Sequence, residues 1–441
     1  MPAPTRLLAA AVTVAACLGA QALPAAAATG TDHEVSRGVT IPAFYNPPAE
    51  LPDTNGALVR SEPLPLALSL PTLHGPLPGT ATRIMYRTTD SGGRPAAATG
   101  AYLEPAAKWR STGPRPLVAL APGTMGQGDQ CAASMGLEHP LRLNGQTVSV
   151  GYEDLAIYRL LAKGVAVVVT DYIGLGTTDR LHTYVNRLDE AHAVLDAVRA
   201  ARTLKGATVT TASRVGLFGY SQGGGATAAA AELQPAYAPD VTLSGTYAGA
   251  PPADLTQTTK AIDGSDLAGA LGWSLNGFLQ SDPELRPIAD AYLNDKGKAA
   301  LEDLSTRCVG DALLAYSSAR STSWTKDGTS LADIIQAEPS LQAFLAEQRI
   351  GTMRPASPVR VATGVSDNLV PHGQARQLAV DWCGRGAQVT YKAVRLPDVG
   401  RALLNHFAPL LTDQGSAVNW LTDRLAGEPA ASNCGALPGQ P

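Results

Sequence analysis

The chain has no run of lysine and arginine residues, and its 441 residues carry a formal net charge of only −4. Nucleic acids and anionic membranes are bound through basic patches, so we expect neither as a partner. The sequence also lacks Cys-x-x-Cys and His-x-x-x-His spacings. Because both spacings are typical of zinc sites, we expect no metal site.

No apolar run near the N-terminus is long enough to span a bilayer, which takes about 20 residues. The apolar segment Leu7 to Ala20 follows Arg6 and precedes a stretch of small residues, as in cleaved export signals. We therefore expect a signal peptide over residues 1–28 and a secreted mature chain. The stretch Val14 to Cys17 also resembles a lipoprotein processing box, so a lipid anchor at the cell envelope through Cys17 stays open.

Few cysteines remain in the expected mature chain: Cys131, Cys308, Cys383 and Cys434. An even count in an oxidising compartment predicts two disulfides. The spacing alone leaves all three connectivities open.

The most informative motif that is present is Gly219-Tyr220-Ser221-Gln222-Gly223. An apolar run, Val215 to Phe218, precedes it, and a helical pattern of small residues follows it. Strand, sharp turn and helix in this order are typical of a nucleophile elbow, where a serine occupies a strained backbone position. Gly219 and Gly223 allow the strand and the helix to approach because they carry no Cβ. The motif therefore predicts Ser221 as a nucleophile.

Short apolar runs that alternate with helical patterns predict the fold. The runs that predict strands are Leu117–Leu120, Val165–Val169, Val215–Phe218, Val241–Tyr247, Val359–Ala362 and Val389–Leu396. The helical patterns between them lie at Glu153–Lys163, Leu188–Leu204 and Gln222–Leu233. This alternation predicts an α/β fold with a mostly parallel central sheet flanked by helices. The segments Arg83–Thr88 and Ala96–Leu103, which are separated by a turn-rich stretch, predict a hairpin.

Breaks in this pattern predict the domain organisation. Proline-rich residues 29–79 lack strong periodicity, so we expect an extended N-terminal arm. Residues 253–355 show helical periodicity without a convincing strand, which predicts an α-helical cap inserted into the sheet's connectivity. The core of the fold is then expected in two parts, 80–252 and 356–441.

A serine nucleophile needs a base to take its proton and an acid to orient that base. In an α/β-hydrolase the acid and then the histidine follow the serine, on loops after later strands. His406, after the last predicted strand, is the expected base, and His372 is a poorer candidate because it starts a predicted helix. Asp367, just past the penultimate strand, is the expected acid, with Asp398 as its rival.

Charge that develops on the substrate oxygen needs hydrogen-bond donors in place beforehand. The backbone N–H of Gln222 is the first expected donor. The second is expected from the glycine-rich loop after the first core strand, where the sequence does not decide between Thr124, Met125 and Gly126. Asp171 and Tyr172, at the end of a parallel strand, could border the pocket, although a structural role is favoured.

At these motifs the chain is similar to the secretory lipase family, which includes fungal lipase A enzymes and exported bacterial relatives. The matching stretches are Gly219–Gly223, Gly123–Cys131, Asp171–Gly176 and Val194–Arg199, within a similarity that runs from about Leu73 to Cys434. The resemblance implies an α/β-hydrolase and a carboxylic ester hydrolase, often acting on triacylglycerols, with a triad that matches Ser221, Asp367 and His406. Acyl transfer through such a triad needs no metal or organic cofactor, so none is expected.

The resemblance also implies a helical cap and two disulfides, Cys131–Cys308 and Cys383–Cys434. Pro122 departs from some relatives, which concerns only the shape of the oxyanion loop. The apolar cap residues that could line an acyl tunnel, or equally pack the cap onto the core, are Leu267, Leu271, Trp273, Leu275, Phe278 and Leu279. We expect a monomer with a small-molecule or lipid ester substrate and transient lipid contact through the cap. A short-chain esterase, an acyltransferase, a serine peptidase and a non-catalytic binding protein stay open as alternatives.

Overall fold

The computed structural model describes residues 34–71 and 76–441. The predicted signal peptide, residues 1–28, and Cys17 lie outside these residues. None of the helices in the described ranges is long and apolar enough to cross a membrane.

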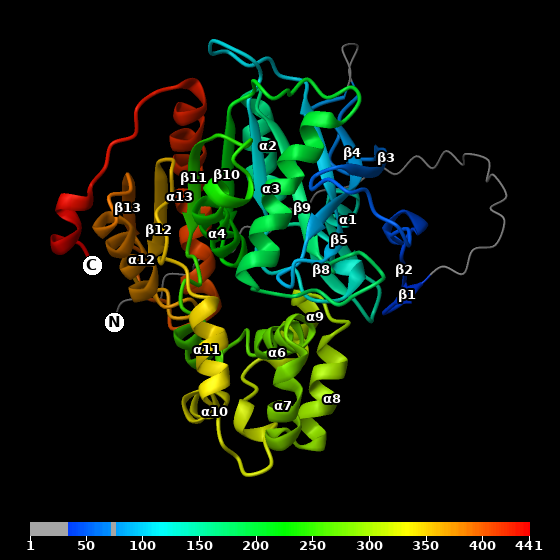
Figure 1. Cartoon of the computed structure of the whole chain (residues 1–441), viewed down its shortest axis with the longest axis vertical. Coiled ribbons are helices and arrows are strands. Elements are labelled where there is room, and N and C mark those ends of the chain that lie inside the picture. The colour runs from blue at the N-terminus through cyan, green and yellow to red at the C-terminus, as the bar shows by residue number, and fades with distance from the viewer. Residues whose placement is uncertain (1–33, 72–75) are drawn as a thin grey trace, which may run out of the picture. The chain divides into compact units, whose positions relative to one another are not determined.

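Nine strands form one central sheet in the order β13-β12-β11-β10-β6-β9-β5-β4-β3 (Figure 1). Neighbours from β13 to β9 are parallel, and β5, β4 and β3 continue the sheet antiparallel. The strand bounds are β3 Leu58–Leu64, β4 Gly79–Thr89, β5 Pro95–Pro105, β6 Leu117–Ala121, β9 Ala166–Ile173, β10 Val215–Tyr220, β11 Leu243–Gly249, β12 Val359–Gly364 and β13 Val389–Val394. The predicted mostly parallel α/β fold is confirmed, and the predicted hairpin is β4 with β5.

Helices cover both faces of the sheet because its strands are apolar on both sides. On β6, Leu117, Ala119 and Ala121 pack into one core and Val118 and Leu120 into the other, as a period of two residues requires. The first core contains α3 (Arg187–Thr203), α4 (Gln222–Tyr237) and α12 (His372–Gly384). The second contains α1 (Ala133–Glu138), α2 (Asp154–Ala162) and α13 (Ala402–Ala426).

Between β11 and β12 the chain leaves the sheet and forms a cluster of helices at one end of it (Figure 1). Their bounds are α5 Leu255–Ile262, α6 Ala270–Ser281, α7 Arg286–Tyr292, α8 Asp295–Leu304, α9 Val309–Tyr316, α10 Leu331–Ala337 and α11 Pro339–Glu347. Trp273, Leu304 and Trp324 are buried at the centre of a separate apolar core within this insertion. The insertion falls in the range 253–355 that the sequence predicts as a cap, and we call it the cap from here on.

The predicted N-terminal arm contains more regular structure than the sequence indicates. Two short strands, β1 (Val35–Ser36) and β2 (Val39–Thr40), pair with each other, and β3 joins the central sheet as its edge strand beside β4. Pro63 lies inside β3, which weakens its strand pattern. An edge strand tolerates proline because one side of its backbone needs no partner.

Candidate active site

Ser221 lies at the sharp turn between β10 and α4, with φ 59° and ψ −124°. Such a backbone conformation is costly for a residue with a side chain and is concentrated at active sites. The N–H of Ser221 donates to Gly249 O at 2.8 Å, and the N–H of Gly225 donates to Ser221 O at 3.0 Å. A Cβ on Gly219 would lie 2.1 Å from Gly223 O, and one on Gly223 would lie 2.0 Å from Ala121 O. Only glycine therefore permits this turn, which is the geometry of a nucleophile elbow.

His406 and Asp367 form a buried pair. His406 Nδ1 lies 2.7 Å from Asp367 Oδ2, and both side chains are almost fully buried. The other carboxylate oxygen of Asp367 accepts the N–H groups of Leu369 and Val370 at 3.1 and 3.0 Å. Since Nδ1 faces a carboxylate, it carries the proton, and Nε2 is left as the basic nitrogen. Nε2 is buried and has no hydrogen-bond partner among the described residues.

Tyr220, the residue before the nucleophile, holds His406 beside the elbow. Its hydroxyl donates to His406 O at 2.7 Å, and the two rings lie 5.3 Å apart. Within the described residues no hydrogen bond joins His406 Nε2 to Ser221 Oγ. Catalytic contacts are often longer in a free enzyme and shorten in the complex with substrate.

The position of His406 differs from the sequence-based expectation in one respect. We expect it in a loop after the last strand, but it lies inside α13, which begins at Ala402. The rival residues are placed elsewhere. His372 begins α12 with its Nε2 3.3 Å from the hydroxyl of Tyr391, and Asp398 is exposed and accepts hydrogen bonds from Gly400 and Asn405.

Side chains fix the peptide planes of the loop that follows β6. Tyr172 donates to Pro122 O at 2.6 Å, and the N–H of Gly123 donates to Glu153 Oε1 at 2.8 Å. Tyr152 donates to Thr124 O at 3.0 Å. In a trans peptide the N–H points opposite to the C=O, so the N–H of Met125 points away from Tyr152.

The amides of the candidate oxyanion donors in this loop are unused. The N–H groups of Thr124, Met125 and Gly126 donate no hydrogen bond to any described residue, and neither does the N–H of Gln222 at the start of α4. These four are the donors that the sequence predicts for an oxyanion hole.

The side chain of Gln222 is anchored at both of its amide hydrogens. Its Nε2 lies 2.8 Å from Glu190 Oε1 and 3.1 Å from His182 Nε2. His182 Nδ1 lies 2.9 Å from Ile173 O and so carries the ring proton, which makes Nε2 an acceptor. Burial lowers the pKa of His182 to about 4, so the ring is neutral at pH 7. Gln222 is therefore held rigidly at the N-terminus of the helix that follows Ser221.

A narrow, largely apolar cavity of about 30 Å³ lies beside Ser221. Two of the predicted tunnel residues, Leu267 and Phe278, line it, together with Leu255 and Ile262 from α5. Phe278 also lines a second cavity deeper in the cap, with Leu275 and Leu279. Leu271 and Trp273, by contrast, are buried in the core of the cap.

Sequence reasoning missed the polar side chains behind the loop. Glu153 and Tyr152 orient its peptides, and Glu190 and His182 hold Gln222. Nothing in their local sequence indicates these contacts, which form between segments far apart in the chain. Asp171 is buried and accepts hydrogen bonds from Ser134 and Thr99, which is a structural role.

The sequence and the fold of this chain are similar to those of proteins named as lipases. The model of the family described as secretory lipase matches residues 137–433. A Mycobacterium tuberculosis protein named as a probable inactive lipase is 29% identical over 88% of this chain and 82% of its own length. A secreted triacylglycerol lipase of Malassezia restricta is 27% identical over 68% of this chain and 62% of its own. Candida antarctica lipase A has a similar fold, with a TM-score of 0.74 at 20% identity over 89% of this chain and 87% of its own.

Proposed function

Because this chain belongs to the secretory lipase family, we propose that it is a secreted lipase that hydrolyses acyl esters through Ser221, His406 and Asp367. The hydrogen bond between His406 Nδ1 and Asp367 Oδ2, beside a strained elbow serine, is the observation that carries this proposal. The family assignment makes the chain a carboxylic ester hydrolase. The identities of the nucleophile, the base and the acid are the further step.

The proposed reaction is acyl transfer in two halves. His406 Nε2 takes the proton of Ser221 Oγ as this oxygen attacks the ester carbonyl. The tetrahedral intermediate collapses to an acyl-enzyme, and the alcohol leaves with the proton from His406. Water then attacks the acyl group, with His406 again as the base, and releases the carboxylic acid. Asp367 keeps the imidazole in the required tautomer and stabilises its cationic form.

We assign the stabilisation of the negative charge on the substrate oxygen to the unused amides. Gln222 supplies one N–H, and Thr124, Met125 or Gly126 supplies the second. All four belong to segments that are fixed by other hydrogen bonds, so little reorganisation is needed when the charge appears. An oxyanion hole made of backbone N–H groups therefore depends on the side chains that hold its peptides in place.

The cavity supports an ester with an acyl chain as the substrate. Its lining beside Ser221 is largely apolar and combines residues of α5 and α6 in the cap with residues of the core, among them Leu369 and Val370. A hydrocarbon chain that enters it loses contact with water, which contributes roughly 0.8 kcal/mol per buried CH₂. A secreted triacylglycerol lipase among the relatives favours the same substrate class. The N-terminal sequence pattern and this relative both favour export, with cleavage at the predicted signal peptide.

The proposal is tested by hydrolysis of p-nitrophenyl esters from acetate to palmitate by the purified protein, with Ser221→Ala as the matched variant. We expect turnover that falls by at least about 10³-fold in Ser221→Ala. The chain-length optimum separates a lipase from a short-chain esterase. A folded parent protein without turnover on any ester would place this chain with the relative named as inactive.

A further inference from the structure

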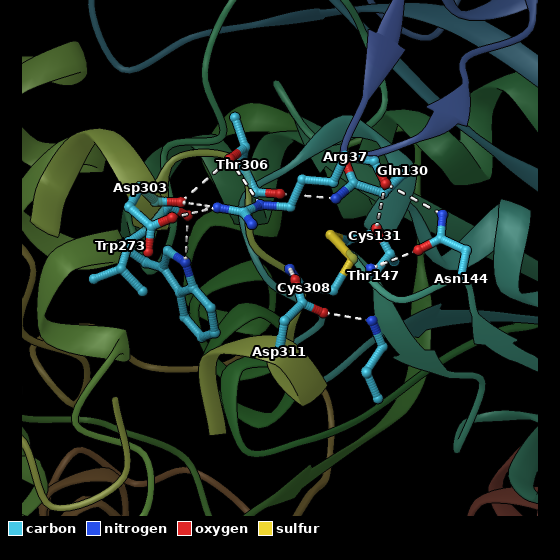
Figure 2. The surroundings of a disulfide bond; sticks show 12 residues. Arg37, Gln130, Cys131, Asn144, Thr147, Trp273, Asp303, Thr306, Cys308 and Asp311 are labelled. Carbon is cyan, nitrogen blue, oxygen red and sulfur yellow. Dashed lines mark hydrogen bonds and ion pairs between the residues drawn. A yellow bond between two sulfur atoms is a disulfide. The ribbon is translucent and has the colours of Figure 1, made fainter. Parts of the chain in front are cut away.

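One segment of the cap lies directly against the loop that carries the unused amides (Figure 2). The N–H of Val309 donates to Met125 O at 2.8 Å, and the N–H of Gln127 donates to Arg307 O at 2.9 Å. Gly126 and Cys308 face each other between these two bonds as an isolated β-bridge. We call residues 306–309 the cap bridge segment.

Side chains reinforce this pairing. Cys308 forms a disulfide with Cys131, at the far end of the same loop, with a Cα–Cα distance of 5.3 Å. Gln130 Nε2 donates to Thr306 O at 2.7 Å. Both cysteines are fully buried. The loop is therefore joined to the cap by backbone bonds, a side-chain bond and a covalent bond within a few residues.

The contact determines where one candidate donor points. Met125 O is directed at Val309, and the trans peptide directs the N–H of Gly126 the opposite way, away from the cap bridge segment. Gly126 has φ 124°, and a Cβ there would lie 2.4 Å from Arg307 O and 2.5 Å from Cys308 Cα. Because the cap bridge segment occupies this space, only glycine fits at position 126. The same segment also fixes the orientation of the peptide between Met125 and Gly126.

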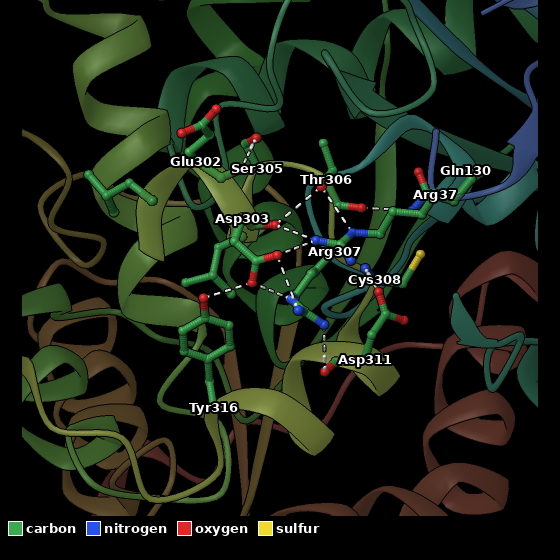
Figure 3. A network of polar contacts seen from close by, with 12 residues as sticks. Arg37, Gln130, Glu302, Asp303, Ser305, Thr306, Arg307, Cys308, Asp311 and Tyr316 are labelled. Atoms are coloured by element: carbon green, nitrogen blue, oxygen red, sulfur yellow. Dashed lines mark hydrogen bonds and ion pairs between the residues drawn. The ribbon is translucent and has the colours of Figure 1, made fainter. Parts of the chain in front are cut away.

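A second set of contacts holds the cap bridge segment from the outside (Figure 3). Arg37, from the turn between β1 and β2, donates through Nε to Thr306 Oγ1 at 2.9 Å and through Nη2 to Asp303 O at 3.0 Å. Its guanidinium also pairs with the carboxylate of Asp303. The same carboxylate accepts Arg307 Nε at 2.6 Å and the hydroxyl of Tyr316 at 2.7 Å.

These contacts fix the oxyanion loop as well as the cap. We propose that the cap bridge segment positions the oxyanion loop for catalysis, with the Cys131–Cys308 disulfide and Arg37 as positioning residues that hold it in place. The inference rests on the proposed function, because it assigns the loop amides to the tetrahedral intermediate. Neither the cysteines nor Arg37 touches the substrate in this proposal; they act through the peptide between Met125 and Gly126.

The test compares two disulfides in the full chain. Cys131→Ser with Cys308→Ser removes the positioning bond, and Cys383→Ser with Cys434→Ser removes the other one, which joins α12 to the C-terminal segment. For the first pair we expect kcat on a p-nitrophenyl ester to fall about 10- to 100-fold with KM changed less than about threefold, because one oxyanion donor contributes about 10² to 10³ in kcat. For the second pair we expect kcat close to that of the parent.

A transition-state analogue provides the readout that a loss of stability alone would not move. A trifluoromethyl ketone forms a tetrahedral adduct with the serine, so its Ki should rise by the same factor by which kcat/KM falls. Equal kcat in the two folded double variants, or an unchanged Ki, would overturn the inference. If the first double variant fails to fold, Arg37→Met tests the same inference. This variant keeps the disulfide and removes the hydrogen bonds to Thr306 and Asp303, so kcat should fall about 3- to 10-fold without a rise in KM. An unchanged kcat in Arg37→Met would overturn the inference. Activity that survives Ser221→Ala refutes the proposed function instead, so the two failures are distinguishable.

Discussion

At the scale of single residues, two buried carboxyl groups near the oxyanion donors have raised pKa values. Glu153 is buried, and burial raises its pKa from 4.5 to about 7, although the bond from the N–H of Gly123 opposes the shift. Glu190, which holds Gln222, has its pKa raised by burial to about 8. A protonated carboxyl group still accepts through its carbonyl oxygen, so both contacts persist in the neutral form.

The shift at Glu153 predicts a dependence of stability on pH. Between about pH 4.5 and 7 the folded state binds more protons at this group than the unfolded state does. The free energy of unfolding therefore decreases as the pH rises through this window, by up to about 1.4 kcal/mol per pH unit for one group. Glu153→Gln keeps an acceptor for Gly123 and removes the titration, so it should flatten the slope.

Urea unfolding at several pH values between 4.5 and 8 measures this slope. Glu428→Gln, at an exposed position after α13, is the matched control and should leave the slope as it is in the parent. A slope that is the same in Glu153→Gln and in the parent would contradict the assignment of a shifted pKa to Glu153.

Prediction from sequence works at residues whose role is tied to a local pattern. Ser221, Gly219 and Gly223 are found because the elbow needs a fixed order of residue types, and the backbone shows why glycine is required there. The hydrogen bonds that Gln222 donates to Glu190 and His182 depend on how distant segments pack, so no spacing in the sequence predicts them.

At the scale of secondary structure, α5 and α6 set the depth of the cavity. Phe278 on α6 packs edge to face against Phe344 of α11, with ring centres 4.9 Å apart, and it lines both the cavity at Ser221 and the second cavity in the cap. The second cavity is lined almost wholly by apolar side chains of α6, α7, α10 and α11. An acyl chain longer than the first cavity would have to pass this ring.

Phe278→Leu should therefore shift the chain-length optimum on p-nitrophenyl esters toward longer acyl chains, because the smaller side chain opens the passage. Leu271→Val is the matched control: Leu271 lies on the same helix, is buried in the cap core and lines neither cavity. The control should lower stability by about 1 kcal/mol without moving the optimum. An unmoved optimum in Phe278→Leu would show that the two cavities do not act as one channel.

The sequence predicts the parallel strands and their helices because both are long enough for their periodicity to be visible. It fails where a helix contains a residue that normally ends one. Pro409 lies inside α13 and packs toward Gly364, where an added Cβ would lie 2.5 Å from its ring. Since proline in a helix interior removes a hydrogen bond, the pattern favours a loop around His406 instead of a helix.

For the molecule as a whole, the two disulfides have different tasks. Cys131–Cys308 spans 177 residues and connects the oxyanion loop to the cap. Cys383–Cys434 spans 51 residues and fastens the C-terminal segment, where Asn433 pairs with Tyr391 of the edge strand β13. Neither cysteine of the second disulfide lines the cavity beside Ser221.

Loss of Cys383–Cys434 should lower the free energy of unfolding by about 4 kcal/mol, as loop-closure entropy gives for a loop of this length. We expect the double serine variant to show this in chemical denaturation, with a kcat at 25 °C close to that of the parent. A comparable loss of kcat would mean that the C-terminal segment supports the site, in contradiction to its position in the fold.

The central claim is that Ser221 is a nucleophile activated by His406. The most direct measurement is labelling of the folded protein with a fluorophosphonate, followed by mass spectrometry of its peptides. We expect one label per chain, on the peptide that contains Ser221, with no label in Ser221→Ala and a rate at least about 10³-fold lower in His406→Ala. A folded protein that takes no label, or takes it on another residue, would contradict the claim.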